Sequence, residues 1–324
     1  MPERERGADS FGHRQEKIVP SEQHCQVVDL LRSFGITDKT GRPVEEQRLA
    51  YEGVSAAYPL EAGAEIEDFS IGSLEADWVI GGGDYADTQA ILYLHGGGYV
   101  IGSRNSHREL ACRIASACSV RVLLPEYRLA PEHPFPAGLD DAVAAYRFLL
   151  DSHYPPSGVL IAGDSAGGGL ALAVLLKILE DDLPLPCGAF ILSPWVDLAM
   201  RGSSMVTNAS IDPVVSRDTL KEMADYYLVG HDPLDPLVSP LEGDLHGLPR
   251  LLIQVGTAEV LLDDARRLAN KATQCGVEVE LQEFEGLVHV FQQLAALAPE
   301  SADALAKIGE FVRSCLSRQD GPLP

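Results

Sequence analysis

Short apolar runs alternate with longer amphipathic stretches along most of this chain. Each run has the length of one strand and is apolar almost throughout, which predicts strands buried on both faces of a parallel sheet. We expect strands at about 89–94, 119–125, 158–163, 188–193, 250–256 and 277–284. Helices are expected near 106–117, 139–151, 166–180, 261–275 and 301–316. The alternation predicts an α/β fold with a doubly wound, mostly parallel sheet.

The two ends of this pattern differ from its centre. Residues 65–80 alternate between polar and apolar positions, which predicts early antiparallel strands. Two amphipathic stretches before them, Gln26–Phe34 and Val44–Ala57, predict helices. Residues 1 to about 15 are polar and are expected to be frayed.

The stretch from about 196 to 247 interrupts the alternation of strands and helices. It is rich in proline, aspartate and glycine, and it contains one expected helix at Asp218–Leu228. Such a segment leaves the sheet and returns to it. We therefore expect an excursion that is able to cover a site on the sheet.

A candidate nucleophile lies at the end of the expected strand 158–163. The pentapeptide Gly163-Asp164-Ser165-Ala166-Gly167 joins this strand to the expected helix 166–180. A strand, a sharp turn and a helix are the setting in which Gly-x-Ser-x-Gly forms a nucleophile elbow. The flanking glycines are needed because side chains there would collide across so tight a turn.

A second glycine-rich motif follows the expected strand 89–94. It reads His95-Gly96-Gly97-Gly98-Tyr99. Acyl transfer passes through a tetrahedral oxyanion that preorganised backbone N–H groups stabilise. We assign these donors to Gly97, Gly98 and Ala166. The alternative, a phosphate-binding loop, is disfavoured because neither Gly-x-Gly-x-x-Gly nor a following Lys-Ser/Thr is present.

A serine hydroxyl needs a general base within hydrogen-bond reach. The histidines after Ser165 are His231, His246 and His289. His231 and His246 lie in polar contexts typical of turns, whereas His289 directly follows the expected strand 277–284. We therefore expect His289 to be the base.

The acid that would orient this histidine is expected after strand 250–256. Glu259 lies at the end of the strand, and a glutamate can orient an imidazole as an aspartate does. Asp263 and Asp264 lie one turn into the next helix, where acidic residues also interact favourably with the helix dipole. Glu259 is the preferred acid, and Asp263 remains the alternative.

The chain resembles the bacterial hormone-sensitive-lipase-like (family IV) carboxylesterases of the α/β-hydrolase superfamily, from about residue 90 to 311. The resemblance rests on the segments 95–99, 127–137, 163–167, 193–197 and 289–291. It implies an α/β-hydrolase fold in which residues 1–60 form a helical cap segment and 61–324 a catalytic domain, with a cap excursion at about 196–235. Many relatives carry Asp-Pro-Leu where this chain has Glu259-Val260-Leu261, which leaves the identity of the acid open.

What the resemblance implies for activity is a serine esterase with Ser165 as nucleophile. Such enzymes hydrolyse short- to medium-chain acyl esters, need no cofactor and often form homodimers. Two alternatives stay open: a hydrolase of amides or lactones on the same triad, and a non-catalytic small-molecule receptor of the same fold. The intact His289 disfavours the receptor, because receptors that resemble this family have lost the histidine.

The composition limits which partners and which compartment we expect for this chain. The formal net charge is −23 and the sequence pI is about 4.6, which argues against nucleic acid and anionic membranes as partners. The six cysteines show no C-x-x-C pairing, so we expect neither a disulfide framework nor a metal site. The first 20 residues lack an apolar signal core, and no apolar stretch is long enough to span a bilayer, so we expect a cytoplasmic protein.

Overall fold

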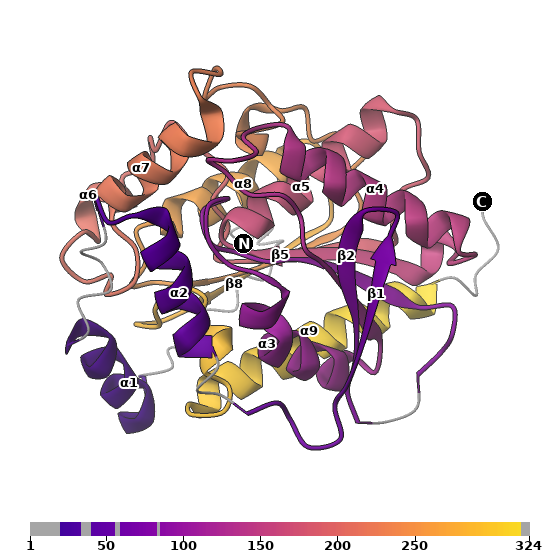
Figure 1. Cartoon of the computed structure of the whole chain (residues 1–324), viewed down its shortest axis with the longest axis horizontal. Helices are drawn as coiled ribbons and strands as arrows, with labels where there is room; N and C mark the ends of the chain where they lie inside the picture. Colours follow the sequence, from indigo (N-terminus) through magenta and orange to yellow (C-terminus); the bar gives the residue numbers. More distant parts are fainter. Residues whose placement is uncertain (1–19, 34–39, 56–58, 83–84, 319–324) are drawn as a thin grey trace, which may run out of the picture.

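A single eight-stranded sheet runs through the centre of the molecule (Figure 1). The computed structural model describes residues 20–33, 40–55, 59–82 and 85–318. The strands lie in the order β1-β2-β4-β3-β5-β6-β7-β8. β2 pairs antiparallel with β1 and β4, and all other neighbours are parallel. The strands are β1 (Glu65–Ile71), β2 (Leu74–Ile80), β3 (Ala90–Leu94), β4 (Arg121–Pro125), β5 (Val159–Asp164), β6 (Gly188–Leu192), β7 (Leu251–Gly256) and β8 (Val279–Phe284).

Helices cover both faces of this sheet. α3 (Arg104–Cys118) and α9 (Pro299–Ser317) pack on one face, and α4 (Ala137–Asp151), α5 (Ala166–Glu180) and α8 (Leu262–Gln274) pack on the other. Side chains of β5 alternate between the two cores, with Val159 and Ile161 in one and Leu160 and Ala162 in the other. This alternation follows from the two-residue period of a strand and explains why the strand is apolar throughout.

The observed fold confirms the expected class and adds detail at the element boundaries. The helix expected at 106–117 begins two residues earlier, at Arg104, because the side chain of Ser103 caps it by accepting a hydrogen bond from the backbone of Ser106. The alternating stretch 65–80 forms the antiparallel hairpin of β1 and β2. The expectation for residues 1–15 lies outside the described residues, as do Phe34 and residues 56–57 of the two early helices.

Two helices precede the sheet, α1 (Glu22–Ser33) and α2 (Val44–Ser55). The excursion after β6 contains α6 (Ser204–Thr207), which the sequence did not predict, and α7 (Arg217–Leu228). Figure 1 shows α2 (indigo) and α7 (orange) on the same side of the molecule. The backbone N–H of Gly41 donates to the Glu222 carboxylate of α7 at 3.1 Å, so the N-terminal segment contacts the excursion directly.

The N-terminal helices also contact the loops that follow the strands. Arg48 of α2 donates from Nε to the carbonyl of Val100 and from Nη2 to that of Ala130, both at 2.9 Å. The same guanidinium pairs with Glu132 at 2.7 Å. On α1, Val28 packs against the apolar cluster around Phe284. The first helices therefore contact the loops that follow β3 and β4 and the apolar cluster at the end of β8.

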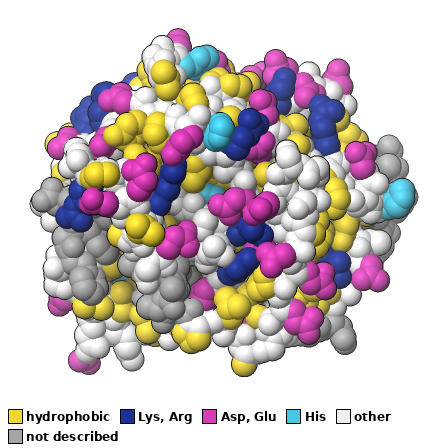
Figure 2. Space-filling model, viewed as in Figure 1, with side chains coloured by type: hydrophobic (Ala, Val, Ile, Leu, Met, Phe, Trp, Pro, Cys, Tyr) yellow, Lys and Arg dark blue, Asp and Glu magenta, His cyan; other side chains and the backbone are white. Residues whose placement is uncertain are grey.

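Charged side chains are spread over the surface of the molecule (Figure 2). On the face in Figure 2, acidic side chains form many small groups with lysine and arginine between them. Across residues 20–318, apart from the three short gaps, no helix combines the length and apolar character needed to cross a bilayer.

Candidate active site

Ser165 lies in the sharp turn between β5 and α5. Its φ of 54° and ψ of −123° are unusual for a residue with a side chain, as a nucleophile elbow requires. A Cβ at Gly163 would lie 2.3 Å from the carbonyl oxygen of Gly167. A Cβ at Gly167 would lie 2.1 Å from that of Leu94. The turn therefore excludes side chains at both flanking positions and lifts the Ser165 hydroxyl out of the chain.

His289 links the serine to an acid. Its Nε2 lies 2.9 Å from Ser165 Oγ, and its Nδ1 lies 2.8 Å from Glu259 Oε2. All three side chains are buried, with Ser165 8% and His289 9% exposed. The structure thus brings together the three residues that the sequence singled out from three different strand ends. His231 and His246 lie elsewhere, in exposed pairs with Asp235 and Asp244.

Glu259 is fixed by its second carboxylate oxygen. Oε1 accepts hydrogen bonds from the Ser193 hydroxyl at 2.8 Å and from the Gly256 backbone N–H at 2.6 Å. The Ser193 hydroxyl in turn accepts from the N–H of Val290, next to the histidine, at 3.0 Å. In the sequence, Ser193 is marked only as part of the family resemblance, and no pattern predicts its bridging position.

The alternative acid contacts a different part of the chain. Asp263 Oδ2 accepts the backbone N–H of Ser204 at 3.0 Å, at the start of α6. Asp264 Oδ2 accepts the N–H groups of Val196 and Asp197, both at 3.0 Å. Within the described part of the chain, Glu259 is the carboxylate that bonds to His289.

Burial and neighbouring charges act on His289 in opposite directions. Burial alone would lower the pKa of its imidazole, because a buried ring is harder to protonate. The hydrogen bond and charge of Glu259, with the charges of Asp212 and Asp164, outweigh burial and leave the pKa above its ordinary value. The imidazolium that forms when a base takes up a proton is therefore stabilised here.

The glycine-rich loop after β3, which contacts the elbow through Gly96 and Asp164, presents free backbone donors. Gly97 has a φ of 116° and Gly98 a φ of 62°. A Cβ on Gly97 would lie 2.1 Å from the carbonyl oxygen of Ile101, so no side chain fits there. Within the described residues, the N–H groups of Gly97, Gly98 and Ala166 donate to no protein acceptor. They are available to a ligand oxygen.

A buried polar network supports this loop. Asp164 Oδ1 accepts from the Tyr93 hydroxyl at 2.8 Å and from the Gly96 N–H at 3.0 Å, and Oδ2 lies 3.5 Å from His107 Nε2. Burial would raise the pKa of Asp164, but the charge and hydrogen bond of His107, with the Tyr93 bond, lower it below its ordinary value. No sequence pattern marks Tyr93 or His107 as supports, although Asp164 stands inside the elbow motif.

His95 belongs to the same loop. Its carbonyl accepts the Tyr127 hydroxyl at 2.7 Å, and its ring stacks on Tyr127 with centroids 4.2 Å apart. Burial lowers the pKa of His95 to about 3, so the ring is neutral. A neutral ring whose Nδ1 lies 2.8 Å from the carbonyl of Gly96 donates its proton there. These contacts hold the loop that carries the free donors.

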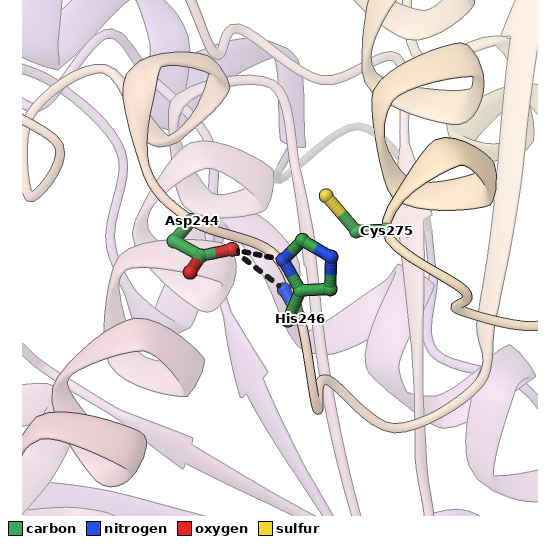
Figure 3. Close-up of side chains that lie close together, drawn as sticks. All are labelled: Asp244, His246 and Cys275. Carbon is green, nitrogen blue, oxygen red and sulfur yellow. Dashed lines mark hydrogen bonds and ion pairs between the residues drawn. The ribbon is translucent and has the colours of Figure 1, made fainter.

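Side chains of metal-ligand type gather at one place among the described residues, on the surface between the loop before β7 and the end of α8. They are Asp244, His246 and Cys275 (Figure 3). His246 Nδ1 already pairs with Asp244 Oδ1, and the two side chains are 69% and 78% exposed. Among the residues that the structure describes, no buried polar group orients them, as the partners of metal-bound histidines usually do. We assign this cluster no part in the chemistry at Ser165.

A profile of the alpha/beta hydrolase fold family matches residues 91–293. An acetyl-hydrolase of Streptomyces hygroscopicus is 42% identical over 271 residues, which cover 84% of this chain and 90% of that protein. An esterase of Acinetobacter venetianus is 40% identical over 228 residues, which cover 70% of this chain and 75% of that protein.

Solved structures agree. The crystal structure of an esterase from the bacterial hormone-sensitive lipase family superposes with a TM-score of 0.88 at 42% identity, covering 92% of this chain and 100% of that chain. The esterase EstE5, in crystals soaked with p-nitrophenyl butyrate, gives a TM-score of 0.88 at 40% identity, with coverages of 92% and 99%. The chain belongs to the α/β-hydrolase family and, within it, to the bacterial hormone-sensitive-lipase-like carboxylesterases.

Proposed function

We propose that this carboxylesterase hydrolyses short- to medium-chain acyl esters through an acyl-enzyme on Ser165. The observation that supports this most directly is the unbroken pair of hydrogen bonds from Ser165 Oγ through His289 to Glu259. A hydroxyl, a base and an orienting acid in this arrangement form the triad of nucleophilic acyl transfer.

In the proposed first step, Ser165 Oγ attacks the ester carbonyl and gives its proton to His289 Nε2. The Glu259 carboxylate stabilises the resulting imidazolium and holds the proton on Nδ1. The carbonyl oxygen becomes an oxyanion, which the N–H groups of Gly97, Gly98 and Ala166 bind. Each such donor is worth about 3 kcal/mol of the barrier.

The tetrahedral intermediate then collapses. The alcohol leaves with the proton from His289 Nε2, and the acyl group stays on Ser165. Water enters, His289 takes its proton, and the hydroxide attacks the acyl carbonyl through a second oxyanion in the same hole. Carboxylic acid leaves, and the serine recovers its proton. No step requires a cofactor or a metal.

The contacts between α7 and the glycine-rich loop support an acyl pocket of limited size. A Cβ at Gly98 would lie 2.0 Å from the sulfur of Met223 on α7, so this methionine lies directly against one proposed oxyanion donor. Tyr99 stacks on Tyr227 of α7 with centroids 4.0 Å apart and meets Trp195 at 6.0 Å. We propose that α7, with α1 and α2, forms a cap whose large side chains restrict the acyl group.

The direct test compares wild type with Ser165→Ala on p-nitrophenyl esters of increasing acyl length. We expect a burst of p-nitrophenol equal to the enzyme concentration, highest kcat/KM for short chains, and loss of activity by at least about 10³-fold in Ser165→Ala. If the alanine variant retained most of the activity, the proposed mechanism would be wrong.

Amides and lactones are the remaining alternative substrates, because the same triad serves all three bonds and an acetyl-hydrolase is among the relatives. Matched acetyl ester and acetyl amide substrates with the same leaving-group ring would separate them. We expect kcat/KM to favour the ester. A ratio that favoured the amide would reassign the substrate class.

Compartment and assembly are also proposals. All six cysteines are free thiols, which fits a reducing, cytoplasmic setting. We propose a homodimer on the family resemblance, and light scattering after gel filtration would give its mass. We propose that the partner is a small ester substrate. A net charge of −23 would repel nucleic acid and anionic membranes.

A further inference from the structure

Besides Glu259 and Asp164, a third carboxylate acts electrostatically on His289. Asp212 belongs to the excursion, between α6 and α7, and is 6% exposed. It raises the pKa of the histidine together with Glu259, which follows β7, and Asp164, at the end of β5. The sequence did not single out Asp212, because it lies in an irregular segment that carries no motif.

Backbone groups hold the Asp212 carboxylate in place. Oδ1 accepts from the N–H groups of Val214 and Val215, both at 2.9 Å, and Oδ2 accepts from that of Val260 at 2.8 Å. All three are donors, and the ionised carboxylate is the form that accepts on both oxygens. Burial holds the pKa of Asp212 above its ordinary value, although the charge of His289 and the three N–H groups oppose that rise.

The bond to Val260 reaches the residue next to Glu259. Two further side chains of the excursion hold the same loop. Asn208 Nδ2 donates to the carbonyls of Glu259 and Thr257 at 2.7 and 3.0 Å, and Ser204 Oγ donates to that of Val260 at 2.6 Å. We call residues 257–260 the acid loop. Its backbone is therefore held on several sides by the excursion.

We propose that Asp212 is a positioning residue of the catalytic centre with two effects. Through Val260 it fixes the acid loop, so that Glu259 Oε2 stays on His289 Nδ1. Through its charge it stabilises the imidazolium that forms when Ser165 attacks. Fixing the loop matters because glutamate has one more rotatable bond than aspartate and needs more support to present its carboxylate. The proposal rests on the acyl-enzyme mechanism described above.

Asp212→Asn tests both effects with little change of shape. The asparagine oxygen can still accept from Val214 and Val215, but the amide nitrogen cannot accept from Val260. We expect kcat to fall by about 10- to 100-fold with KM nearly unchanged. Removing a negative charge lowers the pKa of the histidine, so the acidic limb of kcat/KM should move down by about 0.5 to 1 pH unit.

Asp225→Asn is the matched control. It removes the same unit of charge from the same excursion, at an exposed position of α7 where Asp225 pairs with Lys221. We expect wild-type kcat and a wild-type pH profile. Asn208→Ala separates the two effects, because it removes contacts to the acid loop without changing the charge. It should lower kcat and leave the acidic limb in place.

The proposal is overturned if folded Asp212→Asn has the same kcat and the same acidic limb as Asp225→Asn. A limb that does not move while kcat falls would reduce Asp212 to a structural role. If Asp212→Asn does not fold, two other variants test the proposal. A wild-type kcat in Asn208→Ala would overturn the positioning effect. Asp212→Glu keeps the charge, so an acidic limb of kcat/KM that moved in this variant would overturn the charge effect. Ester hydrolysis that persisted in Ser165→Ala would instead overturn the proposed function.

Discussion

Replacing Glu259 by glutamine is the sharpest test of the triad, because the structure determines how the new side chain must lie. Glutamine has one oxygen and one NH₂ where glutamate has two acceptor oxygens. The position of Oε1 receives the buried N–H of Gly256 at 2.6 Å and the Ser193 hydroxyl at 2.8 Å. Placing the NH₂ there would set two donors against each other and leave a buried N–H unsatisfied, at about 1–3 kcal/mol.

The glutamine oxygen should therefore stay on Gly256, and the NH₂ should face His289 Nδ1. That nitrogen must then accept, which moves the imidazole proton to Nε2, the atom 2.9 Å from Ser165 Oγ. An imidazole protonated on Nε2 cannot take the serine proton. The corresponding exchange in a Ser-His-Asp triad lowers kcat about 10⁴-fold, so we expect a loss of about 10³- to 10⁴-fold, or about 4 to 5.5 kcal/mol.

The assay is initial-rate hydrolysis of p-nitrophenyl acetate, with active sites counted by an organophosphate probe and folding checked by thermal melting. Asp263→Asn is the control, because Asp263 accepts the N–H of Ser204 at 3.0 Å and has no bond to His289. It should lower the melting temperature by a few degrees and kcat by less than about tenfold. A Glu259→Gln enzyme with more than a tenth of wild-type kcat, or a larger loss in Asp263→Asn, would refute this reasoning.

Two further predictions concern the oxyanion loop and pH. Gly97→Ala should abolish most activity, because its Cβ would lie 2.1 Å from the Ile101 carbonyl oxygen. In Gly98→Ala the Cβ meets the flexible end of Met223, so the double variant with Met223→Ala should recover part of the lost activity. The kcat values of wild type, the two glycine variants and the double variant check this, and a double variant no more active than Gly98→Ala would contradict it. His289 must be neutral to accept a proton and its pKa is raised, so the acidic limb of kcat/KM should lie above pH 6.5, and a limb below that value would contradict the assigned charges.

The fold, and which residues meet around Ser165, could be predicted from the sequence because both depend on local patterns. Buried parallel strands are apolar throughout, and the elbow around Ser165 and the loop around Gly97 follow such strands directly. Glu259 could be preferred over Asp263 because one lies at a strand end and the other in a helix. That preference agrees with the observed contact to His289, and the catalytic role itself stays a prediction.

The supporting residues could not be predicted, because their partners are distant in the sequence. Asp212 contacts Val260 across 48 positions, and Tyr93 contacts Asp164 across 71. Nothing in the residues around Asp212 or Tyr93 distinguishes them from ordinary loop and core positions. Their geometry appears only once the excursion and the sheet have packed against each other.

The contacts between the excursion and the acid loop limit how this enzyme can be recombined with its relatives. A chimera that took only residues 196–235 from a relative, to change substrate preference, would replace Ser204, Asn208 and Asp212. The acid loop at 257–260 would still be that of this chain and would lose its partners. The chimera's losses would then be mistaken for poor substrate fit. The excursion and the acid loop should therefore be exchanged together, or these three side chains should be kept. Only then does a change of kcat/KM between substrates report on the substrate pocket alone.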